Sequence, residues 1–145
     1  MIVPDLNLLI YAYDTSSARH EEAKGWWENT LSSRQPIGLA WISIIGFIRI
    51  TTRRGIVPRP ITVADAIATV QSWLALPHVE IIHPTDRHAD VLFALLTELG
   101  TAGNLTSDAH LATLAIEYDA TLATTDVGFL RFPKLRTSNP LKRKP

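Results

Sequence analysis

Apolar residues recur along the chain with two spacings, and stretches of the two kinds alternate. Short apolar runs are typical of buried strands, whereas apolar residues that return every three or four positions indicate one face of a helix. The expected strands are Ile2–Pro4, Ile37–Leu39, Val79–Ile82, Thr121–Ala123 and Leu135–Ser138. The expected helices are Leu6–Tyr13, His20–Leu31, Ile42–Thr52 and three more, which begin near Thr62, near Thr85 or Asp86, and near Asn104 or Thr106. This alternation predicts an α/β fold with a central, mostly parallel sheet flanked by helices.

Polar residues and glycine indicate where several of these helices begin or end. Thr62, with Asp65 three residues later, resembles a capping box, and Gly100 fits a helix stop. The apolar residues expected to face the core are Ile67, Val70 and Leu74 after Thr62, and Leu92, Leu95, Leu96 and Leu99 before Gly100. Residues 55–60 include two prolines and predict a loop.

The length of 145 residues and the apolar share of 46% are those of one globular domain with a substantial core. We expect a single domain over residues 1–145, with an ordered core over about 1–139 and a basic tail over 140–145. The chain contains no cysteine, which excludes disulfides, thiolate zinc sites and a cysteine nucleophile. It shows no signal-peptide pattern and no apolar run near the roughly 20 residues of a membrane helix, so we expect a cytoplasmic protein without a membrane partner.

The formal net charge is zero, which argues against a protein that coats nucleic acid by bulk charge. Basic residues nevertheless gather in two places. The first group is Arg49, Arg53, Arg54 and Arg59, and the second is Lys134, Arg136, Lys142, Arg143 and Lys144. Two interpretations remain open: a solvated surface with a frayed tail, or residues that contact phosphates.

Three aspartates lie where expected strands end or the following helices begin: Asp5, Asp108 and Asp126. In a parallel α/β sheet these positions share one edge, where ligands bind. Carboxylates crowded together repel each other unless one is protonated or a cation lies between them. Oxygen ligands of this kind suit a hard divalent cation such as Mg²⁺ or Mn²⁺. The pattern therefore predicts a metal-dependent phosphoryl-transfer site.

Each aspartate also has a purely structural interpretation. Asp5 suits a turn, Asp126 suits a cap, and Asp108 in a first helical turn is favoured by the helix dipole. Asp108, however, continues the apolar helix face that includes Leu111 and Ala115, where a solvated charge is not expected. The histidines share no spacing that indicates a metal site, and the serine pairs lack a nearby base, so neither residue type is expected to carry the chemistry.

Four segments form a combination that covers almost the whole chain: Val3–Ala12 with the first acid, Gly46–Arg49, Gly103–Ala112 with the second acid, and Thr124–Pro133 with the last acid. Together they resemble the PIN-domain ribonucleases, and within them the VapC-type toxins of bacterial toxin–antitoxin pairs. Any one segment alone would be weak, because an aspartate after a strand is common.

The resemblance implies a three-layer, Rossmann-like fold with the acids at one edge of the sheet. It implies that Asp5, Asp108 and Asp126 hold one or two Mg²⁺ or Mn²⁺ ions for endonucleolytic cleavage of RNA by a metal-activated water. The expected products carry 5′-phosphate and 3′-hydroxyl ends. The resemblance also implies an antitoxin partner and a homodimer.

Four further residues suit supporting roles around these acids. Asn7 is suited to hold Asp5 or a bound water, and Thr124 and Thr125 are suited to hydrogen-bond Asp126 or a substrate phosphate. Arg49 is suited to bind phosphate, because a guanidinium group matches phosphate geometry.

The sequence departs from the family pattern at Gly46 and Gly128, where most or many members carry an acid. The first departure need not mean an inactive protein, but together they leave three acids. The alternative function is therefore a catalytically weakened PIN-fold module that binds RNA or protein. A small-molecule phosphatase is a third hypothesis, which an Asp-x-Asp pair after the first strand would favour, but the chain has Asp5-Leu6-Asn7.

Trp26 and Trp27 are adjacent and cannot both face the same core. One of them is expected to mark a partner surface, and we expect the antitoxin to contact the helix that carries them.

Overall fold

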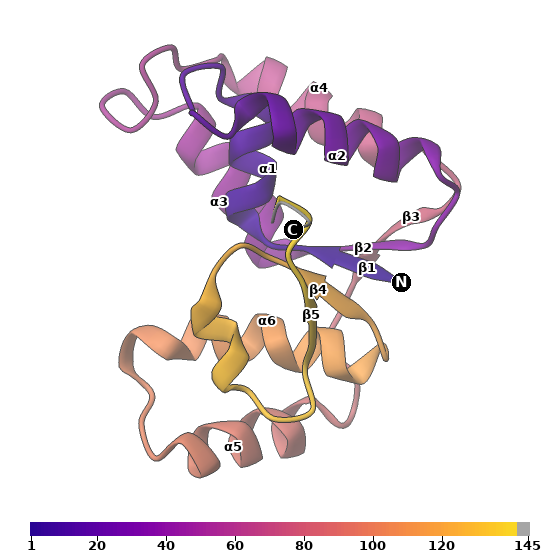
Figure 1. Ribbon diagram of the computed structural model, residues 1–145, viewed down its shortest axis with the longest axis vertical. Coiled ribbons are helices and arrows are strands. Elements are labelled where there is room, and N and C mark those ends of the chain that lie inside the picture. The colour runs from indigo at the N-terminus through magenta and orange to yellow at the C-terminus, as the bar shows by residue number, and fades with distance from the viewer. Residues whose placement is uncertain (142–145) are drawn as a thin grey trace.

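The computed structural model describes residues 1–141, and Figure 1 shows how its elements are arranged. Within these residues, five strands form one sheet: β1 (Ile2–Pro4), β2 (Ile37–Ala40), β3 (Val79–Ile82), β4 (Thr121–Ala123) and β5 (Arg136–Ser138). The helices are α1 (Leu6–Tyr13), α2 (His20–Ser32), α3 (Trp41–Thr51), α4 (Val63–Leu74), α5 (His88–Leu99) and α6 (Thr106–Glu117). Two 3₁₀ helices are η1 (Gly103–Leu105) and η2 (Val127–Arg131). The predicted strands and helices are confirmed, with ends that differ by one or two residues.

The sheet is covered by helices on both faces, which confirms the predicted three-layer α/β fold. The strand order is β3-β2-β1-β4-β5, and each neighbouring pair of strands is parallel. Figure 1 shows α1 to α4 on one side of the sheet and α5 and α6 on the other. Because all the strands point the same way, the segments that follow β1, β2 and β4 meet at one edge.

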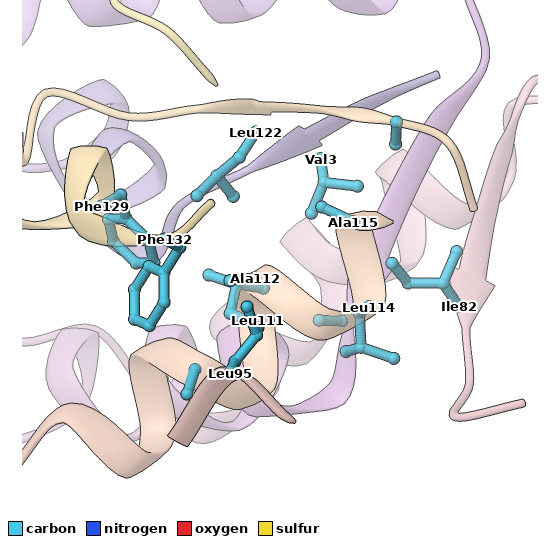
Figure 2. Packing of buried hydrophobic residues seen from close by; sticks show 13 residues of the cluster. Val3, Ile82, Leu95, Leu111, Ala112, Leu114, Ala115, Leu122, Phe129 and Phe132 are labelled. Carbon is cyan, nitrogen blue, oxygen red and sulfur yellow. The ribbon is translucent and has the colours of Figure 1, made fainter. Parts of the chain in front are cut away.

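Helix α6 lies against the sheet through small buried residues. Ala112 and Ala115 are fully buried, as is Val3 of β1, and Figure 2 shows these side chains in one cluster with Phe129 of η2. Burial of a large side chain such as Phe129 contributes about 1.5–3 kcal/mol. This packing fixes the first turn of α6, which carries Asp108, relative to the ends of the strands.

An aromatic cluster joins α1, α2, α3 and α4 on the other face of the sheet. Phe47 contacts Trp73 and Tyr13, with ring centroids 5.0 and 5.6 Å apart. Trp27 meets Trp73 edge-on at 5.4 Å. Such edge-to-face pairs add about 0.5–1.5 kcal/mol beyond the burial of their area. The cluster therefore holds α3, whose opposite side faces the candidate site, in a fixed position.

The prediction that Trp26 or Trp27 of α2 marks a partner surface agrees only partly with the exposure of these side chains. Trp27 is 4% exposed and belongs to the core, and the half-buried Trp26 packs against the same cluster, so the prediction that the two cannot face the same core is wrong. Trp41, at the start of α3, is 48% exposed. A partner surface that uses an exposed tryptophan is therefore better placed on α3 than on α2.

Several predicted helix features are confirmed, and one apolar face is wrong. Thr62 caps α4 by accepting a hydrogen bond from the backbone N–H of Asp65 at 3.1 Å. Gly100 ends α5 in the left-handed conformation, with φ +71°. In α4, the predicted inward residue Ile67 is exposed, and Trp73 is buried instead because its ring joins the aromatic cluster.

Two predicted caps are wrong. The N-cap of α5 is Arg87 instead of Thr85 or Asp86, because the Thr85 hydroxyl donates to a glutamate of α6. The N-cap position of α6 is Leu105, which lies between the two predicted residues and provides no side-chain cap. The turn η1 runs directly into α6, so the first amide groups of this helix follow an existing helical turn.

The last described residues pack against the core. Leu141 is 6% exposed and lies in a cluster with Leu8 and Ala23, so the packed part extends past the predicted end near residue 139. The remainder of the predicted basic tail, residues 142–145, lies outside the described residues. None of the helices in residues 1–141 has the length and apolar character required to cross a bilayer.

Candidate functional site

A cavity of about 540 Å³ lies where the strand ends meet, between α1, α3 and α6. All three predicted acids line it. They come from the end of β1, the first turn of α6 and the segment after β4. The residues that line it are Asp5, Leu6, Asn7, Ile42, Ser43, Ile45, Gly46, Arg49, Ser107, Asp108, Leu111, Asp126 and Phe129. Parallel strand order thus brings Asp5 together with Asp108 and Asp126, each of which is more than 100 residues away from it in the sequence.

Asp5 is the most enclosed of the three acids, with 7% of its surface exposed. It occupies the N-cap position of α1, but its side chain makes no capping hydrogen bond. Its Oδ2 accepts a hydrogen bond from the Thr124 hydroxyl at 2.8 Å. The Asp5 carboxylate is therefore held in place by the side chain of Thr124 at the start of α1.

Thr124 links two of the acids. Its Oγ1 donates to Asp5 and accepts a hydrogen bond from the backbone N–H of Asp126 at 3.0 Å. The Asp126 Oδ1 accepts from the backbone N–H of Gly128 at 2.8 Å, so Asp126 also caps η2, as its structural interpretation predicted. Asp126 therefore combines a capping oxygen with a position in the cavity wall.

Burial and mutual repulsion disfavour negative charge in this cavity. Burial raises the pKa of Asp5, and the charges of Asp108 and Asp126 raise it further, against hydrogen bonds from Thr124 and Leu6 that lower it. Burial also raises the pKa of Asp108, with a further contribution from Asp126 and an opposing one from Arg131. A cation bound among these carboxylates would remove the cause of the repulsion.

The raised pKa of Asp5 predicts a pH-dependent effect of Asp5→Asn on stability without metal. Because the folded pKa lies above the ordinary value of 3.8, the protonated form stabilises the fold, and this contribution is lost as the pH rises through the folded pKa. Asp5→Asn should therefore gain stability relative to the wild type as the pH rises from about 4 towards 7. Urea unfolding in chelator across this range measures the difference, and a pH-independent difference would contradict the prediction.

The donor set of the cavity fits a hard divalent cation. Carboxylate and amide oxygens are the ligands that Mg²⁺ prefers. In residues 1–141, no three His, Asp or Glu side chains are gathered closely enough to enclose an ion by themselves, but Mg²⁺ usually keeps several waters. Ser43 supports the fit, because its Oγ is buried in the cavity wall without a hydrogen-bond partner. Such an orphaned hydroxyl is costly unless a bound group satisfies it.

The predicted supporting residues differ in how close they lie to the acids. Asn7 and Arg49 are exposed and line the cavity, and Thr124 is bonded to Asp5. Thr125 is half-buried, does not line the cavity and donates no side-chain hydrogen bond within residues 1–141. Its predicted contact with Asp126 is therefore not found.

Two further residues near the acids were not predicted from the sequence, Ser43 and Arg131. Ser43 lies three residues before Gly46, on the same side of α3, and this spacing is the signal that would have identified it. Arg131 lies close enough to lower the pKa of Asp108, and its Nε donates to the carbonyl of Gly128 at 2.9 Å. No local pattern distinguishes Arg131 from an ordinary surface arginine.

The two glycines at which the chain departs from the family pattern both have crowded surroundings. A β-carbon at Gly46 would lie 2.5 Å from Cδ2 of Leu6, so any side chain there requires Leu6 to move. A β-carbon at Gly128 would lie 3.0 Å from Oδ1 of Asp126. Neither position accepts an acid unless its neighbour shifts.

A second group of titratable side chains lies outside the cavity, between α5 and α6. His88 Nδ1 is 2.5 Å from Glu117 Oε2, and His88 Nε2 is 2.9 Å from His110 Nδ1. Burial alone would raise the pKa of Glu117, but hydrogen bonds from His88 and Thr85 outweigh it and lower the pKa. The group attaches the start of α5 to two turns of α6, and the histidine spacings in the sequence did not predict it.

Comparisons with known proteins agree with this geometry. The chain matches the family model for the PIN domain over residues 2–135. Ribonuclease VapC33 of Mycobacterium tuberculosis is 42% identical over 142 residues, which cover 98% of this chain and 99% of the relative. Ribonuclease VapC37 of the same organism is 41% identical over 140 residues, or 97% of each chain. The solved structure of VapBC2 from Rickettsia felis, bound to a DNA fragment from their promoter, aligns over 96% of this chain and 98% of that one, with a TM-score of 0.69 and 22% identity.

Proposed function

The chain belongs to the PIN domain family, and from this we propose that it is a Mg²⁺- or Mn²⁺-dependent endoribonuclease, the toxin of a toxin–antitoxin pair. The single observation that carries the proposal is the convergence of Asp5, Asp108 and Asp126 on one cavity, where burial and neighbouring carboxylates raise the pKa of Asp5 and of Asp108. The ribonuclease names of the two relatives support RNA as the substrate.

In the proposed mechanism, the three aspartates would hold a hydrated cation at the edge of the sheet, directly or through its waters. When bound, the cation lowers the pKa of a water and neutralises charge on the scissile phosphate. Asp5 is the buried anchor, and Thr124 fixes the orientation of its carboxylate. Asp108 and Asp126 complete the carboxylate set from α6 and from the segment after β4.

Three neutral or basic side chains complete the proposed site. Asn7 and Ser43 would offer oxygen atoms to a hydrated cation, and the Ser43 hydroxyl would then gain the partner that it otherwise lacks. Arg49, on the rim of the cavity, binds the phosphate through its guanidinium group. Hydrolysis at this site would add water to phosphorus and break the bond between phosphorus and the 3′-oxygen, which leaves 5′-phosphate and 3′-hydroxyl ends.

The proposed partners are an antitoxin and a second copy of the chain. Support comes from the fold likeness to the VapBC2 complex and from exposed apolar side chains beside the cavity. These side chains are Trp41, Ile42 and Ile45 of α3 and Val127 and Leu130 of η2. We also propose that the chain is a single domain and that it acts on RNA in the cytoplasm.

Sequencing of 5′ ends after incubation of total bacterial RNA with the purified protein tests the function. With Mg²⁺ or Mn²⁺, we expect discrete new 5′-phosphate ends, and with chelator we expect none. Ends that persist in chelator would contradict metal dependence. If no new ends form under any condition, the endoribonuclease proposal fails.

One observation favours the alternative of a binding module without catalysis. Gly46 stands at the position where most family members carry an acid, and α3 (Trp41–Thr51) contains no Asp or Glu, so this helix contributes no carboxylate to the cavity. In that case the protein would bind RNA or a protein but would not hold a cation. Calorimetric titration with Mn²⁺ separates the two functions: binding supports the enzyme, and its absence at millimolar metal supports the binding module.

A further inference from the structure

One stretch of the chain carries only positive charge. Between Glu28 and Asp65 there are five arginines and no acidic residue, although the protein as a whole has a formal net charge of zero. Four of these arginines follow the second half of α3 and the loop after it: Arg49, Arg53, Arg54 and Arg59. We call these four residues the arginine row.

The arginine row is exposed and has no counter-charge in the fold. The ion pairs within residues 1–141 join Lys24 to Glu28, His88 to Glu117, and Arg136 to Asp119. No side chain of the row forms an ion pair or donates a hydrogen bond in this part of the chain. A cluster of arginines without counter-charges indicates that the protein binds an anionic partner.

The first and last arginines of the row line two different cavities. Arg49 lines the cavity that holds the acids. Arg59 lines a second cavity of about 740 Å³, together with Thr51 at the end of α3. Figure 1 shows the two loops that form its wall, after α1 and after α3, side by side beyond the end of α3. From Arg49 to Arg53 the chain advances about 6 Å along the helix direction.

The loop that carries Arg59 is folded back onto α3. The backbone N–H of Ile61 donates to the carbonyl of Thr51 at 2.9 Å. The backbones of Arg54 and Val57 form an isolated β-bridge, and the Val57 side chain is buried. Arg59 is therefore held near the end of the helix before a ligand arrives, which lowers the cost of ordering it on binding.

The second cavity is itself mainly basic or neutral. Lys24 and His20 line it with Arg59. The one carboxylate in its wall, Asp14, accepts hydrogen bonds from the backbone N–H and the hydroxyl of Ser16 at 3.0 and 2.6 Å. The cavity thus offers an approaching phosphate more donors than repelling groups.

We propose that the RNA substrate strand leaves the catalytic cavity along the second half of α3. Phosphates next to the scissile one then bind to Arg53 and Arg59. The second cavity is a subsite for nucleotides on one side of the scissile bond. This inference rests on the proposed function and adds a direction for the strand. Single-stranded RNA is favoured over an acidic protein segment because the row begins on the rim of the catalytic cavity, at Arg49, to which the proposed function assigns the scissile phosphate. Sequence-tolerant binding of a single strand uses such a positively charged groove along its backbone.

Salt-dependent RNA binding tests the proposal. The probe is a fluorescein-labelled oligouridylate of about 12 nucleotides, within the site sizes known for single-strand binders. It is measured by anisotropy with the Asp5→Asn protein, so that the RNA stays intact. Adding Arg53→Gln and Arg59→Gln should weaken binding about tenfold and lower the log–log salt slope by about 1.4, because each single-strand phosphate contact contributes about 0.7. In the otherwise wild-type protein, the same pair should raise KM and leave kcat within about twofold, as expected for uniform binding.

Arg34→Gln is the matched control. Arg34 is exposed and precedes β2, so it lies at the edge of the sheet opposite to the catalytic cavity, and its removal should leave the salt slope unchanged. Thermal unfolding of each variant checks that the fold is intact. An unchanged slope and affinity in the double variant would overturn the proposal. Loss of antitoxin binding with unchanged RNA binding would also overturn it and would assign the row to the protein partner.

The outcome for the wild type separates this inference from the function on which it rests. If the wild-type protein neither binds nor cuts RNA, the proposed function fails. If the wild type cuts RNA and the double variant behaves like it, only the strand path fails.

Discussion

Asp108→Asn is expected to lower the rate of RNA cleavage at saturating Mg²⁺ by about 1,000-fold or more. A bound cation supplies several kcal/mol of charge stabilisation in such a reaction, and about 4 kcal/mol corresponds to a factor of 1,000. Asn keeps the size and one oxygen of the side chain but removes the charge that holds the cation. Single-turnover cleavage of a mapped RNA substrate measures the effect, and Mn²⁺ calorimetry should show weaker binding in the same protein.

Asp90→Asn is a close control for this substitution. Asp90 is the third residue of α5, just as Asp108 is the third residue of α6, and both lie in the first helical turn. The two substitutions therefore remove the same favourable contact with a helix dipole, but only Asp108 lines the cavity. Asp90→Asn should cut at the wild-type rate. Metal-dependent cleavage that survives in Asp108→Asn would remove this residue from the proposed site.

Phe47→Ala is expected to cost about 3–5 kcal/mol of unfolding free energy, the range for truncating a buried aromatic residue. Phe47 is fully buried and contacts both Tyr13 and Trp73, so its removal leaves a cavity at the centre of the aromatic cluster. A domain of ordinary stability has only about 5–15 kcal/mol in total. The midpoint of urea unfolding should therefore fall by a large fraction.

Phe93→Ala provides the comparison at the surface. Phe93 is 62% exposed on α5, and its truncation should change the unfolding free energy by about 0.5 kcal/mol or less. Equal losses in the two variants would mean that the aromatic cluster does not carry the stability assigned to it.

The order of elements could be predicted because each helix and strand has a clear apolar period. The run Ile2-Val3-Pro4 and the Leu-rich face of α5 are examples, and the fold places them as predicted. The convergence of Asp5, Asp108 and Asp126 was also predictable, because parallel strands share a carboxyl edge. These features follow from the local spacing of apolar residues and from the rule that parallel strands share a carboxyl edge.

The remaining features depend on contacts between distant segments. Thr85 reads as a helix cap in the sequence, but Glu117, 32 residues later, binds its hydroxyl. Ile67 fits the predicted inward face of α4, but Trp73 is buried instead, because its ring joins the aromatic cluster. Ser43 reads as an ordinary helical serine, and only the folded cavity shows that its hydroxyl has no partner. None of these outcomes is encoded within one turn or one strand.

The close approach of Leu6 to Gly46 constrains how the chain can change by mutation. Because Cδ2 of Leu6 lies where a β-carbon at position 46 would meet it, a glutamate introduced there meets a steric obstacle before it can offer a charge to the cavity. Overpacking of this kind typically costs about 1–3 kcal/mol. Gly46→Glu should therefore be accommodated more readily when position 6 carries a smaller side chain than leucine. The effects of the two substitutions on stability are expected to be non-additive, because the two side chains share one space.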